Sequence, residues 1–178
     1  MTKAEIAAIT QRQREFFATG STLDVNYRIA ALKKLRKSLQ DNEARIAAAL
    51  RSDLGKSAEE SYMCETGLVI SEISYLLRHI RSFAKEKNVV TPLAQFPSRS
   101  YKKPTPYGVV LIMSPWNYPL LLTLDPLADA IAAGNTAVIK PSAYSPATTA
   151  LLAELIAGIF PPEYATVVTG GREENESL

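Results

Sequence analysis

The stretch VVLIMSPWNYP, from Val109 to Pro119, decides the fold class of this chain. Its first five residues are apolar throughout and predict a strand, and the apolar run Leu120–Ala133 that follows predicts a helix. The two prolines fix φ on both sides of Asn117, so we expect the backbone to hold this residue in a strand-to-helix turn. An amide held there can cap the helix or donate to a developing oxyanion, and spacing alone favours neither.

The same alternation of strand and helix continues to the end of the chain. We expect two more strands, Thr136–Ile139 and Thr166–Val168, separated by a helix over Ser145–Ile159. Short strands that are apolar throughout are typical of a parallel sheet with helices on both faces. Residues 107–178 are therefore predicted to form an α/β region with a partial, open parallel sheet.

Residues 1–88 are predicted to be helical, and residues 89–106 to form a Pro-rich extended arm in which Gln95–Lys103 is an edge strand or hairpin arm. Apolar stripes at helical spacing mark the helices. We expect a first helix over Lys3–Thr19 and a third that is capped by Asp41 and closed by Gly55. The second helix follows Asp24, and its apolar face is formed by Val25, Ile29, Leu32, Leu35 and Leu39. The fourth begins near Ser57, and its apolar face is formed by Val69, Ile73, Leu76, Ile80 and Phe83.

The composition excludes several classes of function. Apolar residues make up 47% of the 178 residues and the net charge is +2, which is too balanced to indicate nucleic acid or an anionic membrane as a partner. A single cysteine, Cys64, and a single histidine, His79, argue against a disulfide within the chain and against a metal site. No apolar signal region opens the chain and no run is long enough to span a bilayer, so we predict a cytoplasmic protein.

Lys140 and two glycine pairs are the remaining residues of chemical interest. Lys140 directly follows a predicted strand, where a ligand of a parallel sheet binds, and it could contact a ribose hydroxyl or a phosphate. On chemistry alone, a solvated lysine at a strand end is slightly favoured. Gly134-Asn135 is better explained as a helix C-cap, Gly170-Gly171 lacks the third glycine of a dinucleotide fingerprint, and Cys64 is better explained as a buried hydrophobe than as a nucleophile.

The last residues are polar and acidic. Arg172–Leu178 looks like the first turn of a further helix, and three strands alone would leave a bare sheet edge. We therefore expect this chain to be the front part of a longer protein.

Four ordered motifs resemble the aldehyde dehydrogenases, and most of all their class-3 branch: PTPYGVV (104–110), SPWNYP (114–119), AAGNT (132–136) and IKPS (139–142). The resemblance covers nearly the whole chain. It implies a Rossmann-like cofactor domain without the common glycine fingerprint, NAD or NADP as cofactor, and the oxidation of aldehydes to carboxylates through a cysteine thiohemiacetal.

The resemblance also implies roles for individual residues. Asn117 is expected to donate to the thiohemiacetal oxyanion, and Lys140 to bind the adenosine ribose. The NAD-preferring members often carry Glu where this chain has Ala143, so the choice between NAD and NADP stays open. The expected lining of the cofactor cleft is completed by Met113, Ser114, Pro115, Trp116 and Ser142.

The family's catalytic cysteine and general-base glutamate lie downstream of the Lys-Pro-Ser segment, and Cys64 matches neither. We therefore expect the isolated chain to be inactive and the full-length protein to be a homodimer, since the Pro-rich arm resembles the family's oligomerisation strand. One alternative is a non-catalytic remnant that acts through binding or oligomerisation. Another is a relative that forms acyl-CoA or reduces acyl phosphates, although the wording PWNYP argues against it.

Overall fold

A computed structural model describes residues 1–178. Its centre is a parallel sheet in the order β3-β4-β5, formed by Val109–Met113, Thr136–Lys140 and Ala165–Val167. Every residue of β4 is buried, as expected for the apolar middle strand. The parallel α/β prediction is confirmed, with strand ends that differ from the predicted ones by one residue.

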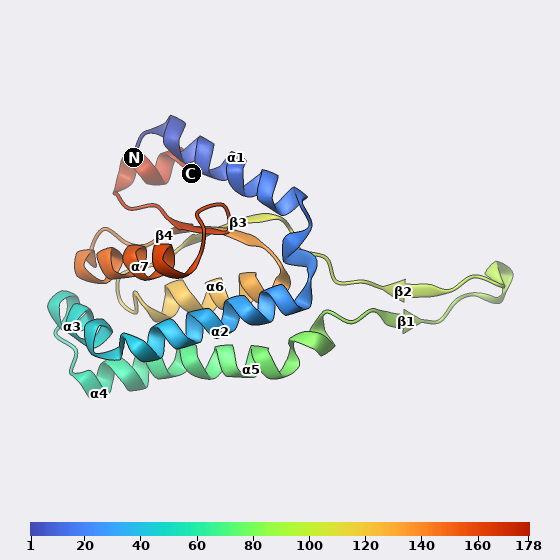
Figure 1. Ribbon diagram of the computed structural model, residues 1–178, viewed down its shortest axis with the longest axis horizontal. Helices are drawn as coiled ribbons and strands as arrows, with labels where there is room; N and C mark the ends of the chain where they lie inside the picture. The colour runs from blue at the N-terminus through green and yellow to red at the C-terminus, as the bar shows by residue number, and fades with distance from the viewer.

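Helices cover both faces of this sheet (Figure 1). On one face lies α1 (Lys3–Ala18), with the short α8 (Arg172–Ser177) beside it, so that the two chain termini are close together. On the other face lie α6 (Leu121–Ala133) and α7 (Pro146–Ile159). Gly134 ends α6 with φ of +94°, which confirms the predicted C-cap.

The helical first half forms a further layer beneath α6. Helices α2 (Val25–Asp41) and α5 (Gly67–Phe83) pack on each other and on α6, and α3 (Glu43–Leu54) packs on α7. One continuous hydrophobic core joins this layer to the sheet, and it includes Leu32, Leu35, Leu39, Val69, Ile73, Leu76 and Ile80 of the predicted stripes. At about 1.5–3 kcal/mol for each fully buried aliphatic side chain, this core supplies the main drive for folding.

Two helix boundaries differ from prediction. Asp41 is the last residue of α2 and does not cap α3, which begins after Asn42 without a side-chain cap. The helix predicted from Ser57 does begin there, as α4 (Ala58–Ser61), but the π-helical turn η2 (Tyr62–Thr66) separates it from α5. The amide of Gly67 bonds to the carbonyl oxygen of Tyr62 in this turn, and a Cβ on Gly67 would lie 2.9 Å from that oxygen.

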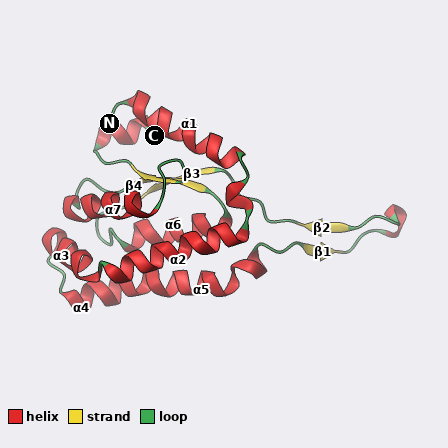
Figure 2. Cartoon of the chain, in the orientation of Figure 1, coloured by secondary structure: helices red, strands yellow, loops and turns green.

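A hairpin projects from the body (Figure 2). It pairs β1 (Lys87–Val89) antiparallel to β2 (Ser100–Lys102), and a 3₁₀ turn, η3 (Leu93–Gln95), lies at its tip. The hairpin interpretation of Gln95–Lys103 is correct for β2. Strand β1 crosses the boundary between the predicted helical segment 1–88 and the arm 89–106, where no strand was predicted. Elsewhere a 3₁₀ turn, η1 (Ser21–Leu23), joins α1 to α2, and no helix has the length and apolar character needed to cross a membrane.

Candidate functional site

A cavity of about 350 Å³ opens at the carboxyl edge of the sheet. Met113 and Lys140 end their strands as register partners and line it, and Ser114 and Ser142 follow them into the same cavity. The first turn of α8 closes the other side. Ligands of open parallel sheets bind at this edge, so the fold brings these four predicted cofactor residues together at the expected place.

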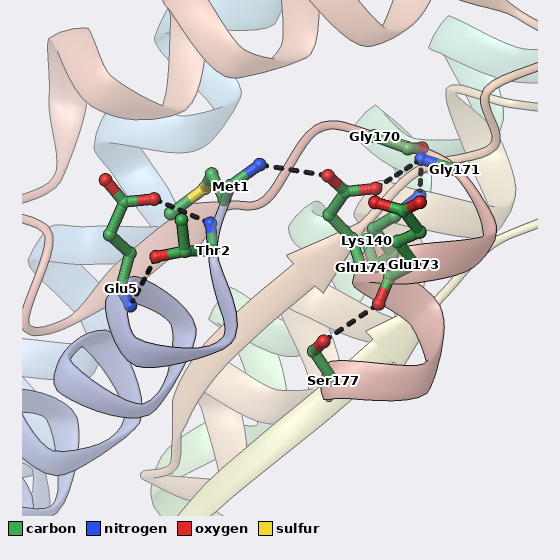
Figure 3. Close-up of polar contacts among 9 residues, drawn as sticks. All are labelled: Met1, Thr2, Glu5, Lys140, Gly170, Gly171, Glu173, Glu174 and Ser177. Atoms are coloured by element: carbon green, nitrogen blue, oxygen red, sulfur yellow. Dashed lines mark hydrogen bonds and ion pairs between the residues drawn. The ribbon is translucent and has the colours of Figure 1, made fainter.

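Lys140 is buried rather than solvated, with 3% of its surface exposed. Its ammonium donates to the carbonyl oxygen of Gly170 (2.8 Å; Figure 3) and to that of Pro141 (2.9 Å). One of its three N–H groups is left without a partner in the chain. Burial lowers the pKa of Lys140, and the nearby Glu174 carboxylate opposes that shift. The solvated-lysine interpretation is therefore wrong.

Glu174 fixes the glycine turn beside Lys140 (Figure 3). Its carboxylate accepts from the N-terminal ammonium of Met1 (2.9 Å) and from the amide of Gly171 (2.7 Å). These donors, the ammonium foremost, lower the pKa of Glu174 to about 2. Gly170 has φ of +137°, and a Cβ there would collide with the Glu174 carboxyl group, so only glycine fits this turn.

Asn117 lies in the exposed turn between β3 and α6. Helix α6 begins at Leu121, and no hydrogen bond from the Asn117 side chain caps it, so the helix-cap interpretation is wrong. The Asn117 amide is free to meet a ligand. Pro115 and Trp116 are exposed in the same turn, outside the cavity that holds Lys140, and 53% of the Trp116 surface is accessible.

Sequence reasoning missed two charged residues behind this turn. The Nζ of Lys56 lies 2.5 Å from Oε1 of Glu65, and both side chains are buried. The ammonium also donates to the carbonyl oxygen of Asn117 (3.3 Å), and Oε2 of Glu65 accepts from the amides of Leu120 and Leu121. One sequence signal existed, because Glu65 stands four residues before Val69 on an otherwise apolar stripe.

The cavity offers hydrogen-bond donors to a polar ligand. Lys140 offers a free donor, and Gly171 opens onto the cavity with no atom within 4 Å of the place a Cβ would take. Ala143 also lines the cavity and brings no charge to it. Cys64 is half-buried in η2 and does not line it.

Comparison with known proteins agrees with this geometry. The sequence model described as "Aldehyde dehydrogenase family" matches residues 1–178. The chain is 44% identical to 4,4'-diaponeurosporen-aldehyde dehydrogenase of Staphylococcus aureus over 93% of its length, and 42% identical to aldehyde dehydrogenase family 3 member B1 of Mus musculus over 94%. It spans 36% of the length of each of these relatives.

Solved structures show the same fold. The substrate-bound state of Staphylococcus aureus AldH superposes with a TM-score of 0.94 at 42% identity, over 97% of this chain and 38% of that one. GapN from Methanocaldococcus jannaschii, solved in complex with NADP, shares the fold with a TM-score of 0.84 at 21% identity, over 98% of this chain and 38% of that one. The motifs around Asn117 and Lys140, the sheet-edge cavity and these matches agree: the chain belongs to the aldehyde dehydrogenase family, and among its similar relatives are members of family 3.

Proposed function

We propose that this chain is the N-terminal part of a cytoplasmic, NAD(P)-dependent aldehyde dehydrogenase that oxidises aldehydes to carboxylates. The observation that carries the proposal is the cavity at the carboxyl edge of β3 and β4, which joins Lys140 to Met113, Ser114 and Ser142. When bound, the nicotinamide cofactor supplies the hydride acceptor. The chain's own residues bind the cofactor and stabilise charge.

Lys140 binds the hydroxyl groups of the adenosine ribose through its free N–H, because its other donors are held by the main chain. Ala143 places no carboxylate beside that ribose, so no charge here repels the 2′-phosphate of NADP, and both NAD and NADP are accommodated. Ser142 belongs to the same ribose subsite, and Met113 and Ser114 line the rest of the cavity. Pro115 and Trp116 lie outside this cavity, and we propose that they line the continuation of the cofactor cleft toward Asn117.

Asn117 donates its side-chain amide to the oxyanion that forms on the aldehyde carbon. Prolines 115 and 119 restrict the backbone around it, and no group of the chain occupies its N–H donors. A donor aimed at a developing oxyanion is worth about 10²–10³ in kcat.

Paired substitutions in the full-length protein test these roles. We expect Asn117→Ala to lower kcat about 10²–10³-fold with little change in the KM for cofactor. Lys140→Met is expected to raise that KM and to spare kcat, because it removes binding and leaves the reacting atoms alone. The exposed Lys85→Met serves as control. An unchanged kcat in Asn117→Ala would refute the oxyanion role.

Residues 1–178 offer no nucleophile for this reaction in our proposal, since Cys64, the single cysteine, does not line the cavity. We therefore expect the purified chain not to oxidise benzaldehyde or a medium-chain aldehyde with either cofactor. The formation of NAD(P)H, followed by the absorbance of the reduced nicotinamide, measures this turnover directly. Turnover by residues 1–178 would overturn the assignment.

The hairpin β1–β2 supports an oligomerisation role for the arm. Its residues Val90, Leu93 and Phe96 are more than four-fifths exposed, and an isolated two-stranded hairpin is marginally stable in water. We propose that it packs on a second copy in a full-length homodimer. The same observation would favour a non-catalytic, oligomerising protein if the full-length protein oxidised no aldehyde with either cofactor.

A further inference from the structure

The buried charges Lys56 and Glu65 are not accounted for by the roles proposed above. Lys56 follows Gly55 at the end of α3, and Glu65 lies in the π-helical turn η2. Their side chains are 9% and 0% exposed. Charges removed from water to this extent persist only where partners compensate the lost hydration, so the identity of the partners shows what the pair holds in place.

All of the partners outside the pair belong to the turn that carries Asn117. Nζ of Lys56 donates to the carbonyl oxygen of Asn117 and lies 4.2 Å from the centre of the Tyr118 ring. Oε2 of Glu65 accepts from the amides of Leu120 (2.8 Å) and Leu121 (3.1 Å). The pair therefore forms hydrogen bonds with the main chain on both sides of Pro119.

These contacts replace the cap that α6 lacks. The residue at its N-cap position is Leu120, which has no side-chain acceptor, so the first amides of the helix depend on a partner from elsewhere. The Glu65 carboxylate meets them 55 residues away in sequence and also suits the positive end of the helix dipole. The Lys56 ammonium, in turn, suits a carbonyl oxygen and an aromatic face.

We propose that Lys56 and Glu65 are positioning residues that fix the main chain at Asn117 and thereby the direction of its amide. The last step rests on the proposed function of Asn117 as an oxyanion donor. The first step, that the pair immobilises the turn from Asn117 to Leu121, does not depend on any activity. The two steps can be tested separately.

Amide hydrogen exchange in the 178-residue chain tests the first step. In Glu65→Gln, exchange at Leu120 and Leu121 is expected to accelerate about tenfold or more, because a charge-assisted acceptor becomes a neutral one. In the control Glu60→Gln, an exposed residue of α4, it stays unchanged. Equal exchange in Glu65→Gln and the parent chain overturns the proposal.

A second variant keeps the test decisive if Glu65→Gln does not fold. Lys56→Met keeps the Glu65 carboxylate that accepts from the amides of α6, but it removes the ammonium that pairs with Glu65 and donates to the carbonyl oxygen of Asn117. Trp116 is the sole tryptophan and lies next to Asn117, so acrylamide quenching of its fluorescence reports the mobility of the turn. Quenching is expected to rise in Lys56→Met and to remain at the parent level in Lys56→Arg; no rise in Lys56→Met overturns the proposal.

Kinetics of the full-length protein test the second step. Glu65→Gln is expected to lower kcat about tenfold at an unchanged KM for cofactor, because only the aim of Asn117 is affected. If Asn117→Ala lowers kcat and Glu65→Gln does not, the positioning role is overturned. If Asn117→Ala itself has no effect, the proposed function of Asn117 fails, and the exchange and quenching results still decide whether the pair holds the turn.

Discussion

Single residues in this chain show how burial and charge are matched. The buried ammonium of Lys140 in the sheet-edge cavity donates to two carbonyl oxygens, which replace part of its lost hydration. The carboxyl group of Asp125 in α6 lacks such partners. Its buried Oδ1 has no hydrogen-bond partner, and the carboxylates of Glu72 and Asp129 lie near it. Burial and these neighbouring carboxylates raise the pKa of Asp125 to about 6. The residue therefore destabilises the fold when it ionises.

The pH dependence of stability tests this assignment. A carboxyl group with a raised native pKa favours folding while it is protonated, and this contribution is lost as the pH rises from 3.8 through about 6. We compare the unfolding free energy of Asp125→Asn with that of the parent chain at pH 4 and at pH 7.5. The difference, variant minus parent, is expected to be about 1 kcal/mol larger at pH 7.5, after allowance for solvent screening. Urea denaturation at the two pH values measures the difference. A gain of the same size in the exposed control Glu43→Gln would contradict it.

At the scale of elements, two helices of the sheet layer receive their caps from the helical first half. Glu65 binds the first amides of α6, and Asp53 of α3 accepts from the amides of Ala147 (3.0 Å) and Thr148 (2.7 Å) at the start of α7. Ser145, at the N-cap position of α7, makes no side-chain cap bond. Carboxylates from one layer thus fix the positions of helices in the other.

Loss of the Asp53 cap is expected to lower stability. We expect Asp53→Ala to reduce the unfolding free energy by about 1 kcal/mol, since it leaves two helix amides without acceptors. Asp53→Asn, which can still accept one of these bonds, is expected to cost less. Chemical denaturation of both variants measures the effect, with the exposed Asp41→Ala as control. A loss of unfolding free energy no larger than that of the control would show that water accepts the hydrogen bonds of the α7 amides as well as Asp53 does.

Local patterns predicted the elements well and these long-range contacts poorly. The stripe Val69, Ile73, Leu76 and Ile80 identified α5 because each member faces the core, and the apolar run at residues 136–139 identified β4. The caps on α6 and α7 join residues 55 and 94 positions apart, and residue spacing carries no information on such contacts. Strand β1 was missed because all three of its residues are exposed, so no alternation marks it.

The candidate site shows the same contrast between features that local sequence predicts and features that depend on long-range contacts. Lys140 was located correctly at a strand end because strand ends are visible in sequence. Its burial was not predicted, because its ammonium contacts the carbonyl oxygen of Gly170, 30 residues away in the chain. The motif around Asn117 was informative through family resemblance, whereas its support by Lys56 and Glu65 required the fold. Residue types therefore predicted where chemistry could occur, and tertiary contacts define how it is held.

At the scale of the whole molecule, the hairpin contributes no residue to the hydrophobic core. It projects from the layered body (Figure 1). Its side chains Val90, Leu93 and Phe96 are exposed. Its two short strands, β1 and β2, pair only with each other, so each has an outer edge able to pair with another chain. Such a surface is stabilised when a second copy covers it.

We expect the full-length protein to be a dimer whose association depends on this arm. The double substitution Leu93→Asp and Phe96→Asp places two carboxylates in the contact and is expected to shift the mass measured by light scattering from dimer to monomer, because burying unpaired charge is costly. The core lies elsewhere, so the circular dichroism of the variant should match that of the parent. Met63→Ser, which alters another exposed apolar side chain outside the arm, should leave the dimer intact. A parent protein that is monomeric, or a variant that remains dimeric, would show that the arm serves another contact.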